Sequence, residues 1–305
     1  MQKGSKIWLN GRLLEWDDAK IHVLTHALHY GTGVFEGIRC FETADGPTLF
    51  RMHDHVKRLL DSAKIYLMDM LYGFDDICDA IILTVRSNRI PDCYVRPIAY
   101  YGYGKMGVTP LPNKVDVAVA AWKWEEYLRS AEAGKGIRCM VSSWRRLDSR
   151  TMPGQAKATA NYANSALARI EALKNGYDEG IMLNTDGLAA ESGAENIFTV
   201  QNGALITPPT TDGALEGITR DTVLEIAKQN GIKSHISSIT RDELYIADEV
   251  FLTGTAAGIT SVSEIDKRTI GDGEVGVVTK EIQRIYEEVV RGKDKRFSKW
   301  LTKVE

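Results

Sequence analysis

Three observations predict an α/β protein that consists of two domains of the α+β type. The chain has 305 residues, enough for two hydrophobic cores. Apolar residues recur at strand spacing in some stretches and at helical spacing in others. A charged stretch that ends in glycines interrupts this pattern. We therefore expect a small N-terminal α/β domain over residues 1–122, a linker over 123–136 and a larger C-terminal domain over 137–305.

The first domain is expected to open with a hairpin. Lys6–Leu9 and Leu13–Trp16 flank Asn10-Gly11, and Asn-Gly between apolar runs is a strong turn signal. Residues 26–43 pass from a helical turn through glycines into an extended run. The remaining pattern predicts helices over 53–66 and 74–88, followed by strands over 93–100 and 115–122.

The second domain is expected to open with a strand at Ile137–Ser142 and to continue past Lys157 into a helix. Ala163, Ala166, Leu167, Ile170 and Leu173 lie on one stripe of that helix. The later pattern predicts a strand over 180–184, a hairpin at Asn202-Gly203, and helices over 219–230, 242–247 and 277–291.

Composition and charge exclude several classes of protein. The formal net charge of −3 gives no reason to expect nucleic-acid binding, and no apolar run is long enough to span a membrane. The N-terminus lacks an apolar signal core, so we expect a cytoplasmic protein. The four cysteines are widely spaced and are expected to be reduced. His22, His26 and His29 have no further ligand at metal-binding spacing, so no metal site is expected.

The chemistry is expected to centre on residues 191–220. Glu191 and Glu195 lie in a small, nearly neutral stretch, and Gly217 precedes a helical pattern. A glycine before the N–H groups of a helix start favours a phosphate. A cofactor with a basic ring nitrogen and a phosphate, such as pyridoxal phosphate, would use both features. It also needs a lysine, and Lys157 lies among small, neutral residues that favour a reactive amine.

Residues 191–220 resemble the signature of the class IV (fold-type IV) pyridoxal-phosphate aminotransferases along their whole length. From Met1 to Glu305 the chain is similar to the branched-chain amino acid aminotransferases. The resemblance implies a fold-type IV enzyme with pyridoxal 5′-phosphate between its two domains. It also implies reversible, ping-pong amino transfer between L-leucine, L-isoleucine or L-valine and 2-oxoglutarate.

The resemblance also implies a set of cofactor contacts. Lys157 would bind the cofactor covalently and act as general base, and Glu191 would pair with the pyridine nitrogen, with Glu195 in a secondary role. The residues alone do not decide between the two glutamates. The phosphate and the ring oxygen would be bound by Arg58, Ile218, Thr219, Thr255 and Tyr162.

Tyr94 and Arg96 are the main candidates for binding the substrate. They are two residues apart in an expected strand, so their side chains share one face and together suit a carboxylate. The resemblance assigns this pair to the distal carboxylate of glutamate. It assigns the α-carboxylate to Thr255, Ala256 and Ala257, and pocket positions to Phe35, Gly37, Tyr30, Val108, Trp124 and Tyr127. Tyr30 and Val108 would come from a neighbouring subunit of a homodimer or homohexamer.

Three alternatives remain open on the same residues. A D-amino acid aminotransferase should lack the pairing of Tyr94 with Arg96. An aminodeoxychorismate lyase should lack a branched-chain pocket. A non-catalytic cofactor-binding protein should lack Lys157 or Glu191. Ala158-Thr159-Ala160 stands where glycines are expected, which leaves open how broad the substrate range is.

Overall fold

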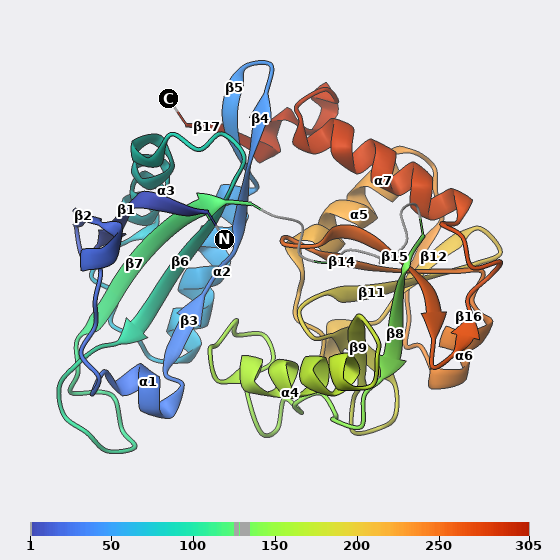
Figure 1. The fold of residues 1–305 in the computed structure, drawn as a ribbon, viewed down its shortest axis with the longest axis horizontal. Helices are drawn as coiled ribbons and strands as arrows, with labels where there is room; N and C mark the ends of the chain where they lie inside the picture. Colours follow the sequence, from blue (N-terminus) through green and yellow to red (C-terminus); the bar gives the residue numbers. More distant parts are fainter. Residues whose placement is uncertain (1, 125–127, 129–134, 305) are drawn as a thin grey trace. The chain divides into compact units, whose positions relative to one another are not determined.

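The structure is a computed structural model that describes residues 2–124, 128 and 135–304 (Figure 1). The chain divides into two compact units. Unit 1 comprises Met1–Glu125, Ala156–Ala160 and Glu288–Glu305, and unit 2 comprises Glu126–Gln155 and Asn161–Glu287. This division differs from the expected boundaries, because the Lys157 segment and the C-terminal segment both belong to unit 1. Most of the expected linker lies outside the described residues.

Unit 1 is built on an antiparallel sheet. Its described strands follow the order β17-β5-β4-β6-β7-β1-β2, with β3 paired to β6. The strands are β1 (Lys3–Leu9), β2 (Arg12–Glu15), β3 (Gly33–Phe35), β4 (Ile38–Thr43), β5 (Gly46–Phe50), β6 (Cys93–Tyr101), β7 (Val115–Lys123) and β17 (Leu301–Lys303). Asn10 and Gly11 have φ of 46° and 89°, as a two-residue turn between twisted strands requires. The predicted first hairpin is therefore confirmed.

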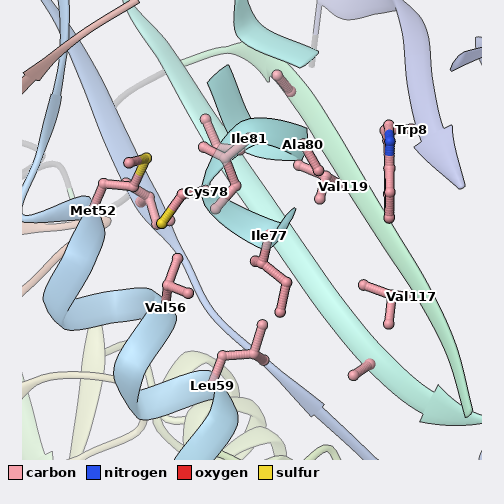
Figure 2. Close-up of a cluster of buried hydrophobic side chains, with 14 of the residues drawn as sticks. Trp8, Met52, Val56, Leu59, Ile77, Cys78, Ala80, Ile81, Val117 and Val119 are labelled. Carbon is pink, nitrogen blue, oxygen red and sulfur yellow. The ribbon is translucent and has the colours of Figure 1, made fainter. Parts of the chain in front are cut away.

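Two helices of unit 1, α2 (Met52–Ile65) and α3 (Phe74–Asn88), pack against this sheet through a continuous apolar core. The short helix α1 (His26–Tyr30) and the 3₁₀ turns η1 (Trp16–Asp18) and η3 (Lys295–Trp300) complete the helical elements of the described part of unit 1. Figure 2 shows side chains of α2, α3 and β7, the last including Val117 and Val119, gathered in this one cluster. Ala156 and Ala158 belong to the same core, so the segment around Lys157 is anchored in unit 1.

Unit 2 is built on a mixed sheet whose described strands follow the order β10-β9-β8-β15-β14-β11-β12-β13. The strands are β8 (Ile137–Val141), β9 (Glu179–Leu183), β10 (Ala189–Ser192), β11 (Asn196–Gln201), β12 (Ala204–Thr207), β13 (Ser234–Ile236), β14 (Glu249–Gly254), β15 (Gly258–Ile265) and β16 (Arg268–Thr269). An additional pairing of β10 with β11 closes part of the sheet into a ring. Asn202 and Gly203 again have positive φ, and they confirm the predicted hairpin of β11 and β12.

Helices flank this second sheet. They are α4 (Asn161–Lys174), α5 (Ile218–Gln229), α6 (Arg241–Ile246) and α7 (Val277–Val290), with the 3₁₀ turn η2 (Thr210–Asp212). The predicted helix after Lys157 is therefore confirmed, but Leu167, Ile170 and Leu173 of its apolar stripe are exposed. Small residues such as Ala168 and Ala172 form the buried face instead. None of the helices in the described residues has the length and apolar character needed to cross a membrane.

Candidate active site

Lys157 lies on the segment Ala156–Ala160, which meets β3 through an isolated antiparallel bridge between Ala158 and Val34. The Phe35 N–H donates to the Lys157 carbonyl at 3.0 Å. The Lys157 N–H donates to Ser62 Oγ of α2, also at 3.0 Å. The ammonium nitrogen, Nζ, lies 5.3 Å from the centroid of the Phe35 ring. Hydrogen bonds to two elements of unit 1 therefore fix the backbone of this lysine.

Partly buried Arg58 forms a polar group, the Arg58 cluster, with the buried side chains of Glu36 and His55. Arg58 Nε donates to Glu36 Oε1 at 2.5 Å, and Arg58 Nη2 donates to Oε2 at 2.9 Å. His55 Nδ1 lies 2.7 Å from the same Oε2. Burial by itself would raise the pKa of Glu36, but the charge of Arg58 and the hydrogen bonds from Arg58 and His55 hold it well below its usual value. Glu36 is therefore an ionised carboxylate inside unit 1.

Arg96 lies on β6 among aromatic side chains. Arg96 Nη2 donates to the Tyr94 hydroxyl at 3.2 Å, and the guanidinium carbon lies 4.7 Å from the centroid of the Phe35 ring. The Tyr94 ring stacks on Trp124 with 4.7 Å between centroids. A Cβ at Gly37 would lie 1.8 Å from the Tyr94 hydroxyl oxygen, so only glycine fits at that position. Five expected substrate residues are thus brought together in unit 1, namely Phe35, Gly37, Tyr94, Arg96 and Trp124.

Two other expected substrate residues lie apart from this group. Tyr30 is on α1 and 41% exposed, and Val108, in the loop after β6, is 84% exposed. Within the described part of unit 1, neither of them shares a hydrogen bond or a ring contact with Arg96. Tyr127 lies outside the described residues.

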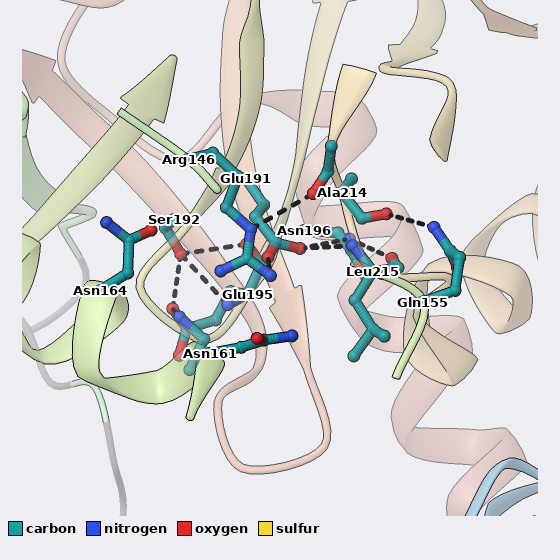
Figure 3. A network of polar contacts seen from close by, with 12 residues as sticks. Arg146, Gln155, Asn161, Asn164, Glu191, Ser192, Glu195, Asn196, Ala214 and Leu215 are labelled. Atoms are coloured by element: carbon teal, nitrogen blue, oxygen red, sulfur yellow. Dashed lines mark hydrogen bonds and ion pairs between the residues drawn. The ribbon is translucent and has the colours of Figure 1, made fainter. Parts of the chain in front are cut away.

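Glu191 lies on β10 in unit 2, where donors surround its carboxylate (Figure 3). Arg146 Nη2 lies 2.8 Å from Oε1 in a buried ion pair. The Leu215 N–H donates to Oε2 at 2.9 Å, and Asn196 Nδ2 donates to it at 3.4 Å. Arg146 is itself held by the Gly213 carbonyl, to which its Nε donates at 3.2 Å. The ion pair offsets the unfavourable burial of the Glu191 charge.

Glu195 lies nearby in sequence but in a different electrostatic environment. The Ser192 hydroxyl donates to Oε2 at 2.6 Å, and the Ala194 N–H donates to it at 3.2 Å. Oε1 is buried without a hydrogen-bond partner among the described residues. Burial, together with the charge of Glu179, raises the pKa of Glu195 to about 7. Glu191 is therefore better placed than Glu195 to carry a lasting negative charge.

We expect Glu195→Gln to change how stability depends on pH. The folded pKa, about 7, lies above the ordinary value of 4.5, so the native state holds this proton more tightly than the unfolded chain. The contribution of this proton to the free energy of unfolding is complete below the ordinary pKa. It is lost as pH rises through the folded pKa, a loss of about 3 kcal/mol. Urea unfolding at about pH 5 and at about pH 8 gives the fall in the free energy of unfolding between the two pH values. This fall should be smaller in the variant than in the native chain. Asp186→Asn, an exposed control, should keep the native difference, and an unchanged difference in Glu195→Gln would contradict the prediction.

The start of α5 has the features of an anion site. Its N-cap residue, Gly217, has no side chain that could cap the helix, and Ile218 and Thr219 form the first turn. A Cβ at Gly217 would lie 1.8 Å from Asn196 Oδ1. Arg220 Nη2 donates to the Pro208 carbonyl at 2.9 Å, which ties the helix to the end of β12. The helix start is thus held in place, and the dipole of the helix favours an anion there.

The remaining expected cofactor residues of unit 2 lie at the ends of elements. Thr255, Ala256 and Ala257 form the turn between β14 and β15, and Tyr162 lies in the first turn of α4. A Cβ at Gly254 would lie 3.2 Å from Glu195 Cγ, so this turn begins beside Glu195.

Comparison with known proteins decides the family. The family model described as amino-transferase class IV matches residues 33–265. The chain belongs to the class IV aminotransferases. It is 44% identical over 304 residues to a branched-chain-amino-acid aminotransferase of Salmonella typhimurium, covering 99% of this chain and 98% of that one.

Solved structures of class IV aminotransferases agree with this assignment. The branched-chain amino acid aminotransferase of T.th., solved with pyridoxamine 5′-phosphate, has a TM-score of 0.97 at 46% identity and covers 100% of both chains. The Escherichia coli branched-chain amino acid aminotransferase has a TM-score of 0.96 at 44% identity, covering 99% of this chain and 100% of that one. The predicted fold-type IV architecture is confirmed, as are the aminotransferase activity and the pyridoxal-phosphate cofactor.

Each unit of this class IV aminotransferase carries groups whose chemistry fits that cofactor. In unit 1 Arg58 is a cation that suits a phosphate, and in unit 2 the start of α5 favours an anion. Glu191 offers an ion-paired carboxylate that suits a protonated ring nitrogen. Lys157 offers the amine.

Sequence reasoning missed Glu36, His55 and Arg146. Glu36 had a detectable signal, because a carboxylate between Phe35 and Gly37 interrupts an apolar run and such a buried charge needs a partner. His55 lies three residues before Arg58 on α2, where the helical repeat places both on one face. No comparable signal marks Arg146, whose partner lies 45 residues further along the chain.

Proposed function

We propose that this aminotransferase moves amino groups between L-leucine, L-isoleucine or L-valine and 2-oxoglutarate, giving L-glutamate and branched 2-oxo acids. The observation that carries the proposal is Arg96, a cation with aromatic neighbours and a hydrogen bond to Tyr94. Such a site suits both a glutamate carboxylate and an apolar side chain. The T.th. enzyme was solved with N-(5′-phosphopyridoxyl)-L-glutamate and, separately, with 4-methylvaleric acid, which supports this dual use.

Lys157 and Glu191 are proposed to serve one pyridoxal phosphate. When bound, this cofactor supplies a carbonyl that joins the amine and a ring that takes up electrons. Lys157 Nζ would hold the cofactor and, once free, would act as the base that moves the proton between substrate Cα and cofactor C4′. Glu191, held by Arg146, keeps a proton on the ring nitrogen. Glu195 orients neighbouring groups through Ser192.

The remaining roles follow from donor chemistry. Arg58, the N–H groups of Ile218 and Thr219, and the hydroxyls of Thr219 and Thr255 are proposed to bind the phosphate, and Tyr162 the ring oxygen. The N–H groups of Thr255, Ala256 and Ala257 are proposed to bind the substrate α-carboxylate. Phe35, Gly37, Trp124 and Tyr127 would form the pocket around Tyr94 and Arg96.

Self-association completes the proposal. Tyr30 and Val108 are exposed in the single chain, which supports a role for them in the active site of a neighbouring subunit. We propose a homodimer or homohexamer on this basis. The four cysteines are buried and unpaired, which fits a reducing compartment and a cytoplasmic location.

Visible absorption of the purified protein tests the proposed reaction. The band of the bound cofactor should bleach with L-leucine and return with 2-oxoglutarate. Bleaching by D-alanine alone would favour a D-amino acid aminotransferase. An absence of any band after pyridoxal phosphate is added would reject Lys157 as its ligand.

We expect Arg96→Met to separate the two substrates. The kcat/KM for glutamate should fall roughly 10- to 100-fold, because a charge-assisted contact to the distal carboxylate is lost. The value for leucine should change little, because methionine preserves the apolar contact with Phe35. The measurement is kcat/KM of each half-reaction, with Arg86→Met, an exposed arginine of α3, as the control. Equal losses for both substrates would show that Arg96 does not distinguish them.

A further inference from the structure

Glu36 lies at the centre of the Arg58 cluster and has no role in the proposed chemistry. It occupies the turn between β3 and β4, and its side chain is fully buried. Both of its carboxylate oxygens accept hydrogen bonds, including one from the Gly37 N–H at 3.2 Å. Its own N–H donates to the Pro97 carbonyl at 2.9 Å. The backbone of Glu36 is thus fixed to β6, and its side chain is fixed to α2 and to the Gly37 N–H.

Glu36 binds one edge of the Arg58 guanidinium. The two contacts involve Nε and Nη2, at 2.5 Å and 2.9 Å, and together they define the plane of the group. An arginine side chain loses considerable rotamer freedom when it is ordered. Because the Glu36 pair orders the side chain in advance, binding an anion to Arg58 requires little further ordering.

His55 completes the arrangement from the same helix as Arg58. Burial lowers the pKa of His55 despite the neighbouring carboxylate, so the ring is neutral at neutral pH and its Nδ1–H donates a hydrogen bond to Glu36 Oε2. Glu36 therefore faces a single full positive charge within the cluster, that of Arg58. The pair is neutral overall, which keeps the partly buried guanidinium compensated before any anion binds.

We propose that Glu36 is a positioning residue that aims Arg58 at the cofactor phosphate and so sets the preference of the protein for phosphorylated pyridoxal. This inference rests on the proposed function, in which Arg58 binds the phosphate. It predicts that loss of Glu36 weakens binding of pyridoxal phosphate much more than binding of pyridoxal, which has no phosphate.

The test measures the affinity of the cofactor-free full chain for pyridoxal phosphate and for pyridoxal. In Glu36→Gln the ratio of the two affinities should fall roughly 10- to 100-fold, because the amide no longer aligns the guanidinium. Glu36→Asp keeps the charge but is shorter, so its ratio should fall less. Glu42→Gln, an exposed carboxylate of β4, should keep the native ratio. A general loss of packing would lower both affinities together and would overturn the proposal, as would native ratios in both Glu36 variants.

A double-mutant cycle separates this inference from the assignment of Arg58. Arg58→Met should lower the ratio, and adding Glu36→Gln to it should cause no further fall if Glu36 acts only through Arg58. Glu36→Gln alone leaves the charge of Arg58 without its partner and could fold poorly. The double variant removes both charges, so it can still be compared with Arg58→Met. An unchanged ratio in Arg58→Met would reject the phosphate role of Arg58 itself. A further fall in the double variant would reject only the positioning role of Glu36.

Discussion

Lys157→Ala should lower the rate of amino transfer by roughly 10⁴-fold or more, the largest effect expected in this chain. The change removes the amine that joins the cofactor and the group that accepts the Cα proton. Because the backbone around Lys157 is held by Phe35 and Ser62, alanine should leave the segment in place. The drop should therefore appear in kcat, without a matching loss of thermal stability.

Borohydride reduction gives a second readout for Lys157. In the native protein it should attach the cofactor permanently, and peptide mapping should locate the label on Lys157. The Ala variant should yield no labelled lysine. Lys64→Ala, an exposed lysine of α2, should behave as the native chain does. Retention of a tenth of the native rate in Lys157→Ala, or a label elsewhere, would disprove the assignment.

Local signals in the sequence predicted much of the fold correctly. Asn10-Gly11 and Asn202-Gly203 determined two hairpins, because these residue pairs tolerate the positive φ that tight turns require. The helices over 53–66 and 74–88 agree closely with α2 and α3. In each case neighbouring residues contain all the information that the element needs.

The sequence could not predict in the same way that the Lys157 segment belongs to unit 1. This segment pairs with β3, more than 120 residues earlier in the chain, and small alanines bury it. Ala-Lys-Ala has no periodicity that identifies a distant partner strand. The same limit applies to Arg146, whose pairing with Glu191 depends on the arrangement of unit 2 rather than on spacing. Non-local contacts of this kind become visible only in the folded chain.

Glu191→Gln should reduce amino transfer roughly 10²- to 10³-fold, as expected when a buried electrostatic contact to the reacting system is lost. A neutral amide cannot stabilise a protonated ring nitrogen, although it has nearly the same shape as the carboxylate. Arg146 would also lose its buried partner, so stability must be measured alongside activity. The matched variant is Glu195→Gln, four residues away in the same unit.

The comparison of the two variants decides which glutamate serves the nitrogen, a question that the residues alone leave open. Glu191 is ion-paired with Arg146, whereas burial and the charge of Glu179 favour the protonated form of Glu195 near neutral pH. A carboxyl that loses its charge near neutral pH is a poor partner for a cation that must persist through the reaction. Glu195→Gln should therefore keep most of the native rate, and its absorption band should stay close to that of the native protein. If Glu195→Gln proves the more damaging change, Glu195 is the partner of the ring nitrogen and Glu191 the secondary carboxylate. The ion pair of Arg146 with Glu191 then stabilises the fold of unit 2 and has no part in the reaction.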